Sequence, residues 1–310
     1  MRVASSRSTS PAHEKSATSS LRDLVQLLRP AQWSKNAVLL GAILFSKHLF
    51  DPNAVLRVVG GVASFCLIAS AAYVMNDLRD MERDRRHPQK RNRPLPSGRV
   101  QPAGALMIGV VVGALGIALA AVLGTNFLLL VLFYLGWQIA YTFFMKELVI
   151  LDVMALATGF VVRAVAGGVV IAVPISPWLV ICTFLLALFM GFAKRRHEVI
   201  LLDAGAVDHR RSLREYSPYF LDQMISVVTA STVVAYAVYT VSPEVREKLG
   251  TQYLYLTIPF VLFGIFRYLY LVHQKEEGGN PTHLMLNDAP LMVDVLLFGV
   301  TAALLLYWGR

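Results

Sequence analysis

The chain of 310 residues is too apolar for an ordinary soluble protein. Hydrophobic residues make up 56% of it and charged residues only 16%, whereas soluble chains carry about 25% charged residues. The mean hydropathy is +0.56 and the net charge is +9. This composition disfavours a soluble enzyme, a disordered protein and a nucleic-acid binder, and it predicts an all-α, polytopic membrane protein.

The first twenty residues are polar and hold nine Ser or Thr. They lack the apolar core of a signal peptide, so we expect residues 1–20 to form a disordered tail. Apolar and charged residues then alternate at helical spacing from Leu21 to Arg29, which predicts a helix along the membrane surface. Residues 21–310 are expected to form one transmembrane domain.

Nine apolar runs are long enough to cross a membrane, which takes about 20 helical residues. They cover residues 34–50, 55–76, 100–123, 126–145, 148–173, 177–194, 221–242, 251–273 and 288–308. The first run is the weakest, because Lys35, Lys47 and His48 crowd its ends. We therefore expect a bundle of nine transmembrane helices.

Lysine and arginine gather on one side of this arrangement. The tail up to Lys35 holds six of them, residues 77–99 hold eight and residues 194–220 hold six; Lys146 and Lys275 bring that side to 22, against five on the other. Loops rich in these residues stay in the cytoplasm. The N-terminus and the two long charged loops are thus predicted to be cytoplasmic.

Three carboxylates follow the second span. Asp77, Asp80 and Asp84 are spaced i, i+3 and i+7, so they would share one face of a helix. Stacked carboxylates repel one another unless a cation lies among them, and Mg²⁺ takes one or two carboxylates together with substrate phosphates. The spacing therefore predicts a magnesium–diphosphate site. The alternative is a solvated helix end, in which each Asp pairs with a neighbouring arginine.

A cationic loop comes next, because three prolines between residues 88 and 96 end the helix. Lys90, Arg91 and Arg93 lie on this loop. Cations beside a metal–phosphate site are typical phosphate ligands, although the positive-inside pattern alone also places cations here.

The motif NDxxDxxxD at residues 76–84, followed by KRxRPLPSG at 90–98, resembles the first aspartate-rich motif of the UbiA superfamily of intramembrane prenyltransferases. The resemblance runs from residue 27 to the C-terminus. Six further segments together make it specific to a subgroup of phosphoribosyltransferases: RPAQWSKN, YTFFMK, RAVAGG, AKRRHE, RRSLREYS and IPFVLFGIFRY.

The resemblance implies a nine-helix UbiA-like bundle with a cytoplasm-facing active site in a bacterial-type inner (plasma) membrane. It also implies Mg²⁺-dependent transfer of the 5-phosphoribosyl group from 5-phosphoribosyl 1-diphosphate to a polyprenyl (decaprenyl-type) phosphate. That product would serve the synthesis of lipid-linked arabinose and cell-wall polysaccharide. No nucleic-acid partner is expected, and the sequence leaves the oligomeric state, including a homo-oligomer, open.

The chain departs from the wider superfamily after its sixth expected span. Ordinary members carry a second aspartate-rich motif there, which binds a prenyl diphosphate through a second Mg²⁺. Here residues 194–198 read Lys-Arg-Arg-His-Glu, with no DxxxD pattern, and such cations suit direct phosphate contact. Two alternative functions remain open. One is a conventional prenyltransferase, which joins a prenyl diphosphate to an aromatic or other acceptor. The other is a non-catalytic lipid carrier.

Site residues follow from the motif and the resemblance. Asp77, Asp80 and Asp84 are the catalytic candidates and, with Asn76, the expected Mg²⁺ ligands. The candidate substrate-binding residues are Lys35, Tyr73, Asn76, Lys90, Arg91, Arg93, Tyr141, Lys146, Lys194, Arg195 and Glu198.

Two charged residues inside expected spans have no assigned role. Asp152 and Arg163 are too far apart along a helix to pair directly, so Arg163 is expected to find its partner on another helix. Gly159, Gly167 and Gly168 are expected to allow close helix packing.

Overall fold

The computed structural model describes residues 20–86, 90–203, 211–275, 278–279, 284 and 287–308. Within these ranges the chain is helical and no strand occurs. The disordered tail expected over residues 1–20 lies outside the described residues except for Ser20. That residue caps the first helix, with its side chain accepting a hydrogen bond from the Asp23 backbone N–H.

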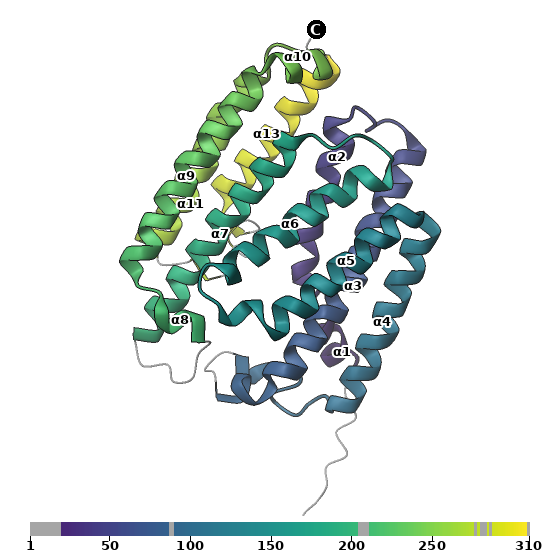
Figure 1. Cartoon of the computed structure of the whole chain (residues 1–310), viewed down its shortest axis with the longest axis vertical. Helices are drawn as coiled ribbons and strands as arrows, with labels where there is room; N and C mark the ends of the chain where they lie inside the picture. Colours follow the sequence, from purple (N-terminus) through teal and green to yellow (C-terminus); the bar gives the residue numbers. More distant parts are fainter. Residues whose placement is uncertain are drawn as a thin grey trace, which may run out of the picture.

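The described residues form sixteen helical elements. In chain order they are α1 (Leu21–Leu28), the 3₁₀ helix η1 (Pro30–Leu39), α2 (Leu40–Phe45), α3 (Pro52–Arg86), η2 (Lys90–Asn92), α4 (Pro102–Leu123), α5 (Thr125–Phe143), η3 (Met145–Glu147), α6 (Leu151–Val170), α7 (Pro177–Asp203), α8 (Arg211–Glu215), α9 (Pro218–Val241), α10 (Pro243–Leu249), η4 (Leu254–Thr257), α11 (Ile258–Gln274) and α13 (Ala289–Tyr307). Figure 1 shows α1 and α8 at one end of the bundle and α10 at the other.

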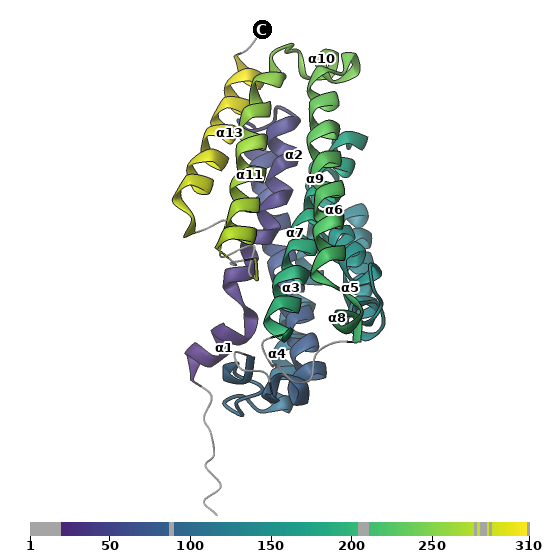
Figure 2. The ribbon, with the colours of Figure 1, turned by 90° about the vertical axis from the view of Figure 1, so that its left-hand side faces the viewer.

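Eight of the described helices are long and apolar enough to cross a membrane, so the chain is a multi-pass membrane protein. The continuous span expected over residues 34–50 is not among them. That region is η1 followed by the short α2, and Figure 2 shows it rising from α1 toward α2. A 3₁₀ helix rises about 2.0 Å per residue, so the two segments together extend about 29 Å. The count of nine crossings therefore stays a prediction.

Two helices continue beyond the apolar runs that mark their spans. Helix α3 passes the run that ends at residue 76 and ends at Arg86, before the prolines, as expected; α7 passes the run that ends at residue 194 and ends at Asp203, where a loop was expected. No Gly or Pro interrupts either extension, and Arg, Lys and Glu are good helix formers. The charged segments placed in loops by the sequence are thus largely the ends of long helices.

Helix α6 lies at the centre of the bundle and joins two apolar cores. Its Val153 and Ala157 belong to a core formed with α7, α9 and α11. Its Val162, Ala166 and Val170 belong to another, formed with α3, α5 and η1. The two cores divide the bundle into an α3–α5 half and an α7–α13 half.

Close contacts hold η1 between α3 and α6. The Trp33 indole N–H donates to Ser70 Oγ on α3 over 3.0 Å. On the other side, a Cβ built on Gly167 of α6 would lie 2.3 Å from the Leu39 carbonyl oxygen, and one on Gly168 would lie 2.8 Å from Ile175. The close packing expected at these two glycines is therefore confirmed.

Replacing Gly167 with Ala is expected to destabilise the bundle. The new methyl group would meet a backbone oxygen, so η1 or α6 must shift, and overpacking of this kind costs about 1–3 kcal/mol. Gly136→Ala is the matched control, since a Cβ there meets nothing within 4 Å. The thermal unfolding midpoint of the detergent-solubilised protein should fall only for Gly167→Ala. Equal midpoints for the two variants would contradict the close packing.

Candidate active site at the end of helix α3

The three carboxylates of the aspartate-rich motif lie on one buried face of α3, as their spacing predicts. Asp77, Asp80 and Asp84 are only 2%, 7% and 4% exposed. The alternative of a solvated helix end is therefore wrong. Arginines of the same helix bond elsewhere: Arg79 donates to the Phe143 carbonyl and Arg83 pairs with Glu147.

Cations from distant parts of the chain neutralise this face. Lys146 of η3 is fully buried and donates to both oxygens of Asp80 over 2.7 and 2.8 Å. Its Nζ also lies 3.3 Å from Asn76 Oδ1. Two of the expected substrate-binding residues, Asn76 and Lys146, thus meet at Asp80.

Two arginines cover the other two carboxylates. Arg93 Nη1 donates to Asp84 over 2.7 Å and to Asp77 over 3.2 Å, and Arg29, just before η1, forms an ion pair with Asp77. The Arg29 guanidinium also lies over the Tyr73 ring, 5.1 Å from its centroid. Burial lowers the pKa of the Arg93 guanidinium, Arg29 adds to that effect, and the Asp77 and Asp84 carboxylates oppose it.

The other two loop cations differ from each other. Lys90 is half-buried and close enough for its charge to act on Asp84, whereas the Arg91 side chain is exposed. Among the candidates of this loop, the structure therefore brings Arg93 and Lys90 to the carboxylate face.

The carboxylate face fits a divalent cation in its chemistry. In the described residues no three Asp, Glu, His or Cys side chains converge as a ready metal site, because each carboxylate faces a protein cation. One of these, Arg93, bridges Asp77 and Asp84, so the space between the two carboxylates accommodates a positive charge. Their oxygens are the ligand type that Mg²⁺ prefers.

The expected basic cluster on α7 has a different arrangement. Arg195 is 1% exposed, and each of its three nitrogens bonds to protein: Nε to Asp152 over 2.6 Å, Nη1 to Glu198, and Nη2 to Tyr141 over 3.4 Å. The candidates Tyr141, Arg195 and Glu198 thus come together, but the guanidinium faces its own chain. Lys194 is 38% exposed and lies 3.9 Å from Glu198.

Asp152 extends this network and its role was not apparent from the sequence. Its second oxygen accepts a hydrogen bond from the Tyr216 hydroxyl over 2.8 Å, and that hydroxyl accepts one from the Ile150 backbone N–H over 2.6 Å. The only signal in the sequence is an ionisable residue inside an apolar span. Arg29 was not among the candidate site residues either, although its position at the start of the RPAQWSKN segment could have indicated it.

Arg163 finds its partners on other elements, as expected. Its guanidinium donates to Asn36 Oδ1 on η1 over 2.8 Å and to the Tyr134 hydroxyl on α5, and it also bonds the Gly159 carbonyl of its own helix. Lys35, the neighbour of Asn36, is half-buried.

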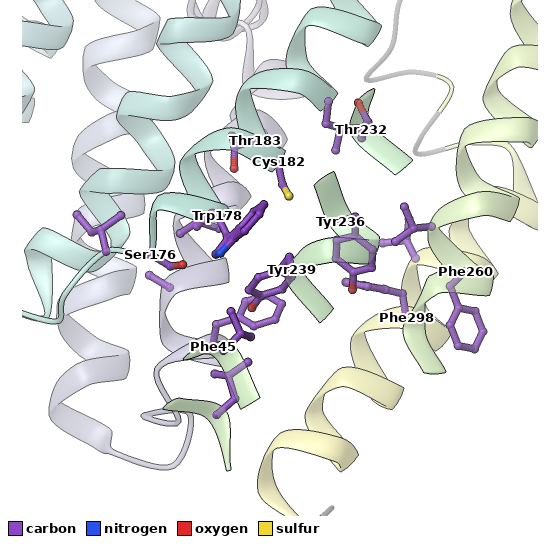
Figure 3. A pocket seen from close by; sticks show the side chains of 18 of the residues that line it. Phe45, Ser176, Trp178, Cys182, Thr183, Thr232, Tyr236, Tyr239, Phe260 and Phe298 are labelled. Carbon is purple, nitrogen blue, oxygen red and sulfur yellow. The ribbon is translucent and has the colours of Figure 1, made fainter. Parts of the chain in front are cut away.

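An apolar cavity of about 500 Å³ lies between α2, α7, α9, α11 and α13 and reaches α10. Figure 3 shows Phe45, Trp178, Tyr236, Tyr239 and Phe298 directed into it. Apolar and aromatic walls of this kind suit a hydrocarbon chain. The sequence did not predict this cavity.

Asp152→Ala is expected to destabilise the protein by about 3 kcal/mol, because removing one partner of a buried ion pair strands the other charge. This loss of stability is at the lower end of the range for broken buried ion pairs, because Arg195 keeps its second carboxylate partner, Glu198. Glu82→Ala is the control: it breaks an exposed pair with Arg85 on α3, and such pairs contribute under about 1 kcal/mol. Thermal unfolding in one detergent compares the two, and a smaller loss for Asp152→Ala would contradict a buried pair.

Comparison with known proteins identifies the family. Residues 37–286 match the UbiA prenyltransferase family. Decaprenyl-phosphate phosphoribosyltransferase of Corynebacterium glutamicum is 31% identical over 87% of this chain and 82% of its own length. The protein of that name from Mycobacterium tuberculosis is 31% identical over 92% and 95%. A UbiA homolog from Archaeoglobus fulgidus, solved bound to GPP and Mg²⁺, superposes with a TM-score of 0.70 at 19% identity over 90% of this chain and 98% of that one. The chain therefore belongs to the UbiA prenyltransferase family, as a membrane-embedded transferase.

Proposed function

We propose that the protein transfers the 5-phosphoribosyl group of 5-phosphoribosyl 1-diphosphate to a polyprenyl phosphate of decaprenyl type and releases diphosphate. The observation that carries this proposal is the similarity to the two phosphoribosyltransferases over 82% and 95% of their lengths. The site supports it, because its single carboxylate face is surrounded by cations suited to several phosphate groups. The product would be a precursor of lipid-linked arabinose and cell-wall polysaccharide.

The carboxylate face would hold Mg²⁺ through Asp77 and Asp84, with Asp80 and Asn76 beside them. When bound, the metal would neutralise the negative charge that develops on the departing diphosphate. Lys146 keeps Asp80 in place by two hydrogen bonds. Arg93 would turn from the two carboxylates to diphosphate oxygens, with its planar fork suited to bidentate contact.

The chain's residues need not supply a general base. The acceptor is a phosphate, which is already an anion at neutral pH, and loss of diphosphate leaves a carbocation-like C1 of the ribose. The His273–Asp222 pair is not a candidate base at this site, because it joins α11 to α9 and neither helix carries any of the three carboxylates. In-line attack by the acceptor phosphate would invert the anomeric centre.

Arg195 acts in this scheme as a positioning residue. It ties α7 to Asp152 of α6 and to Tyr141 of α5, and the chain continues from Tyr141 to Lys146 within a few residues. Lys194 is the member of the α7 cluster whose exposure leaves it able to reach a donor phosphate.

A direct assay tests the function. Purified protein is given labelled 5-phosphoribosyl 1-diphosphate, polyprenyl phosphate and Mg²⁺, and in parallel a prenyl diphosphate with 4-hydroxybenzoate. We expect a labelled lipid product only in the first reaction. Product in the second alone would establish the conventional prenyltransferase, and product in neither would favour the lipid carrier.

The same assay in sealed vesicles tests the orientation. We propose that the N-terminus and the carboxylate end of the bundle face the cytoplasm of a bacterial-type inner membrane. Everted vesicles should then use the water-soluble donor added outside, whereas right-side-out vesicles should not. The reverse result would contradict this orientation.

Asp77→Asn and Asp84→Asn are each expected to reduce turnover at least about a hundredfold, because the cation loses an anionic ligand. Glu82→Gln, with the same charge change on an exposed side chain of α3, is the control and should stay near wild type. Activity is measured against Mg²⁺ concentration, with thermal unfolding as the check on folding. Near-normal activity of either Asn variant at low Mg²⁺ would show that the metal binds elsewhere.

A further inference from the structure

Two buried or half-buried cations near the carboxylate face lack a carboxylate partner. Asp77, Asp80 and Asp84 pair with Arg29, Arg93 and Lys146. In the part of the chain that the structure describes, Lys35 has no hydrogen bond or ion pair, and Arg163 bonds only to uncharged groups.

Lys35 and Arg163 are neighbours in space. The residue after Lys35, Asn36, accepts a 2.8 Å hydrogen bond from Arg163 Nε. Burial, together with the positive charges of Arg163 and Arg29, lowers the pKa of Lys35 to about 8. Two cations held together away from water repel each other, and an anion between them removes that repulsion.

Arg163 is fixed in a rigid setting. It is 5% exposed, and its guanidinium lies over the Tyr134 ring at 4.8 Å and the Phe160 ring at 5.3 Å. Each of its three nitrogens donates one hydrogen bond to an uncharged group, so the charge is not neutralised and one N–H on each Nη is left over. Such a guanidinium, held beside the Lys35 ammonium, is a favourable arrangement for a phosphate group.

Each member of the pair shares a chain segment with the apolar cavity, and Lys35 also shares one with the carboxylate face. Along the N-terminal segment, Lys35 falls between Arg29, which binds Asp77, and Phe45, which lines the cavity. Along α6, Arg163 is five residues, or about 7.5 Å, from Gly168, which also lines the cavity. We therefore expect a phosphate on the pair to lie near the donor's site, with the apolar space available to the chain attached to that phosphate.

We propose that Lys35 and Arg163 bind the phosphate of the lipid acceptor, while the carboxylate face binds the diphosphate of the sugar donor. This inference rests on the proposed function and assigns the two phosphate-bearing substrates to separate subsites. The first units of the acceptor's hydrocarbon chain would enter the apolar cavity.

Equilibrium binding, which needs no turnover, tests the assignment. Full-length protein in nanodiscs is titrated with labelled polyprenyl phosphate. The competitors, added separately, are polyprenol of the same length, inorganic phosphate, and 5-phosphoribosyl 1-diphosphate together with Mg²⁺. We expect Lys35→Gln to bind polyprenyl phosphate roughly tenfold or more weakly, the loss for one charge-assisted hydrogen bond. Polyprenol and inorganic phosphate should compete poorly with the lipid.

Two further variants sharpen the test. Lys275→Gln removes the same charge from an exposed lysine at the end of α11 that does not line the cavity, and it should bind the lipid like wild type. Arg163→Lys keeps the charge but loses the fork, so it should also weaken lipid binding, with thermal unfolding confirming that it folds. In turnover, Lys35→Gln should raise the KM for the lipid and leave the KM for the sugar donor unchanged.

Unchanged lipid binding in Lys35→Gln, an equal loss in Lys275→Gln, or a loss confined to the sugar donor would each overturn the inference. Strong competition by inorganic phosphate would also do so, since the pair would then be a general anion site. Wild-type protein that binds polyprenyl phosphate through Lys35 but ignores 5-phosphoribosyl 1-diphosphate would contradict the proposed function and leave the lipid-phosphate site standing.

Discussion

Burial of three like charges on one face of α3 is the constraint on which the rest of the site depends. Carboxylates held at 2–7% exposure are unfavourable unless cations approach them. The chain meets this demand with Arg29, Arg93 and Lys146, which come from the N-terminal segment, the loop after α3 and the turn between α5 and α6. Folding around α3 therefore assembles the groups that we propose to bind phosphate at the same time as it neutralises the aspartates.

Local periodicity explains what the sequence predicted well. The spacing of Asp77, Asp80 and Asp84 determines a shared face in any α-helix, and the apolar runs mark most of the spans that the structure contains. The UbiA-like fold followed from the motif around these aspartates and agrees with the solved structures. None of these predictions needed knowledge of which helices touch.

Tertiary contacts explain what could not be predicted. Lys146 and Asp80 are 66 residues apart, so no local pattern pairs them. Arg195 was expected to face a phosphate because its cluster was placed in a loop. Once α7 continues through it, neighbouring positions point in directions about 100° apart, which leaves Lys194 partly exposed and turns Arg195 into the core. The N-terminal apolar run is not one continuous α-helix, because the 3₁₀ helix η1 precedes the short α2, and no count of apolar residues reveals that division.

The short turn that carries Lys146 is attached to both halves of the bundle. Its ammonium holds Asp80 in the α3–α5 half, while its backbone carbonyl accepts a hydrogen bond from Ser212 Oγ of α8 over 2.9 Å. Four residues later, Ile150 has a φ of 67°, a conformation that a β-branched residue rarely adopts, and its N–H is held by Tyr216 from the other half. Any relative movement of the two halves must therefore displace Lys146 from Asp80 or break these bonds. Neutralisation of Asp80 by Lys146 therefore depends on the relative position of the two halves of the bundle.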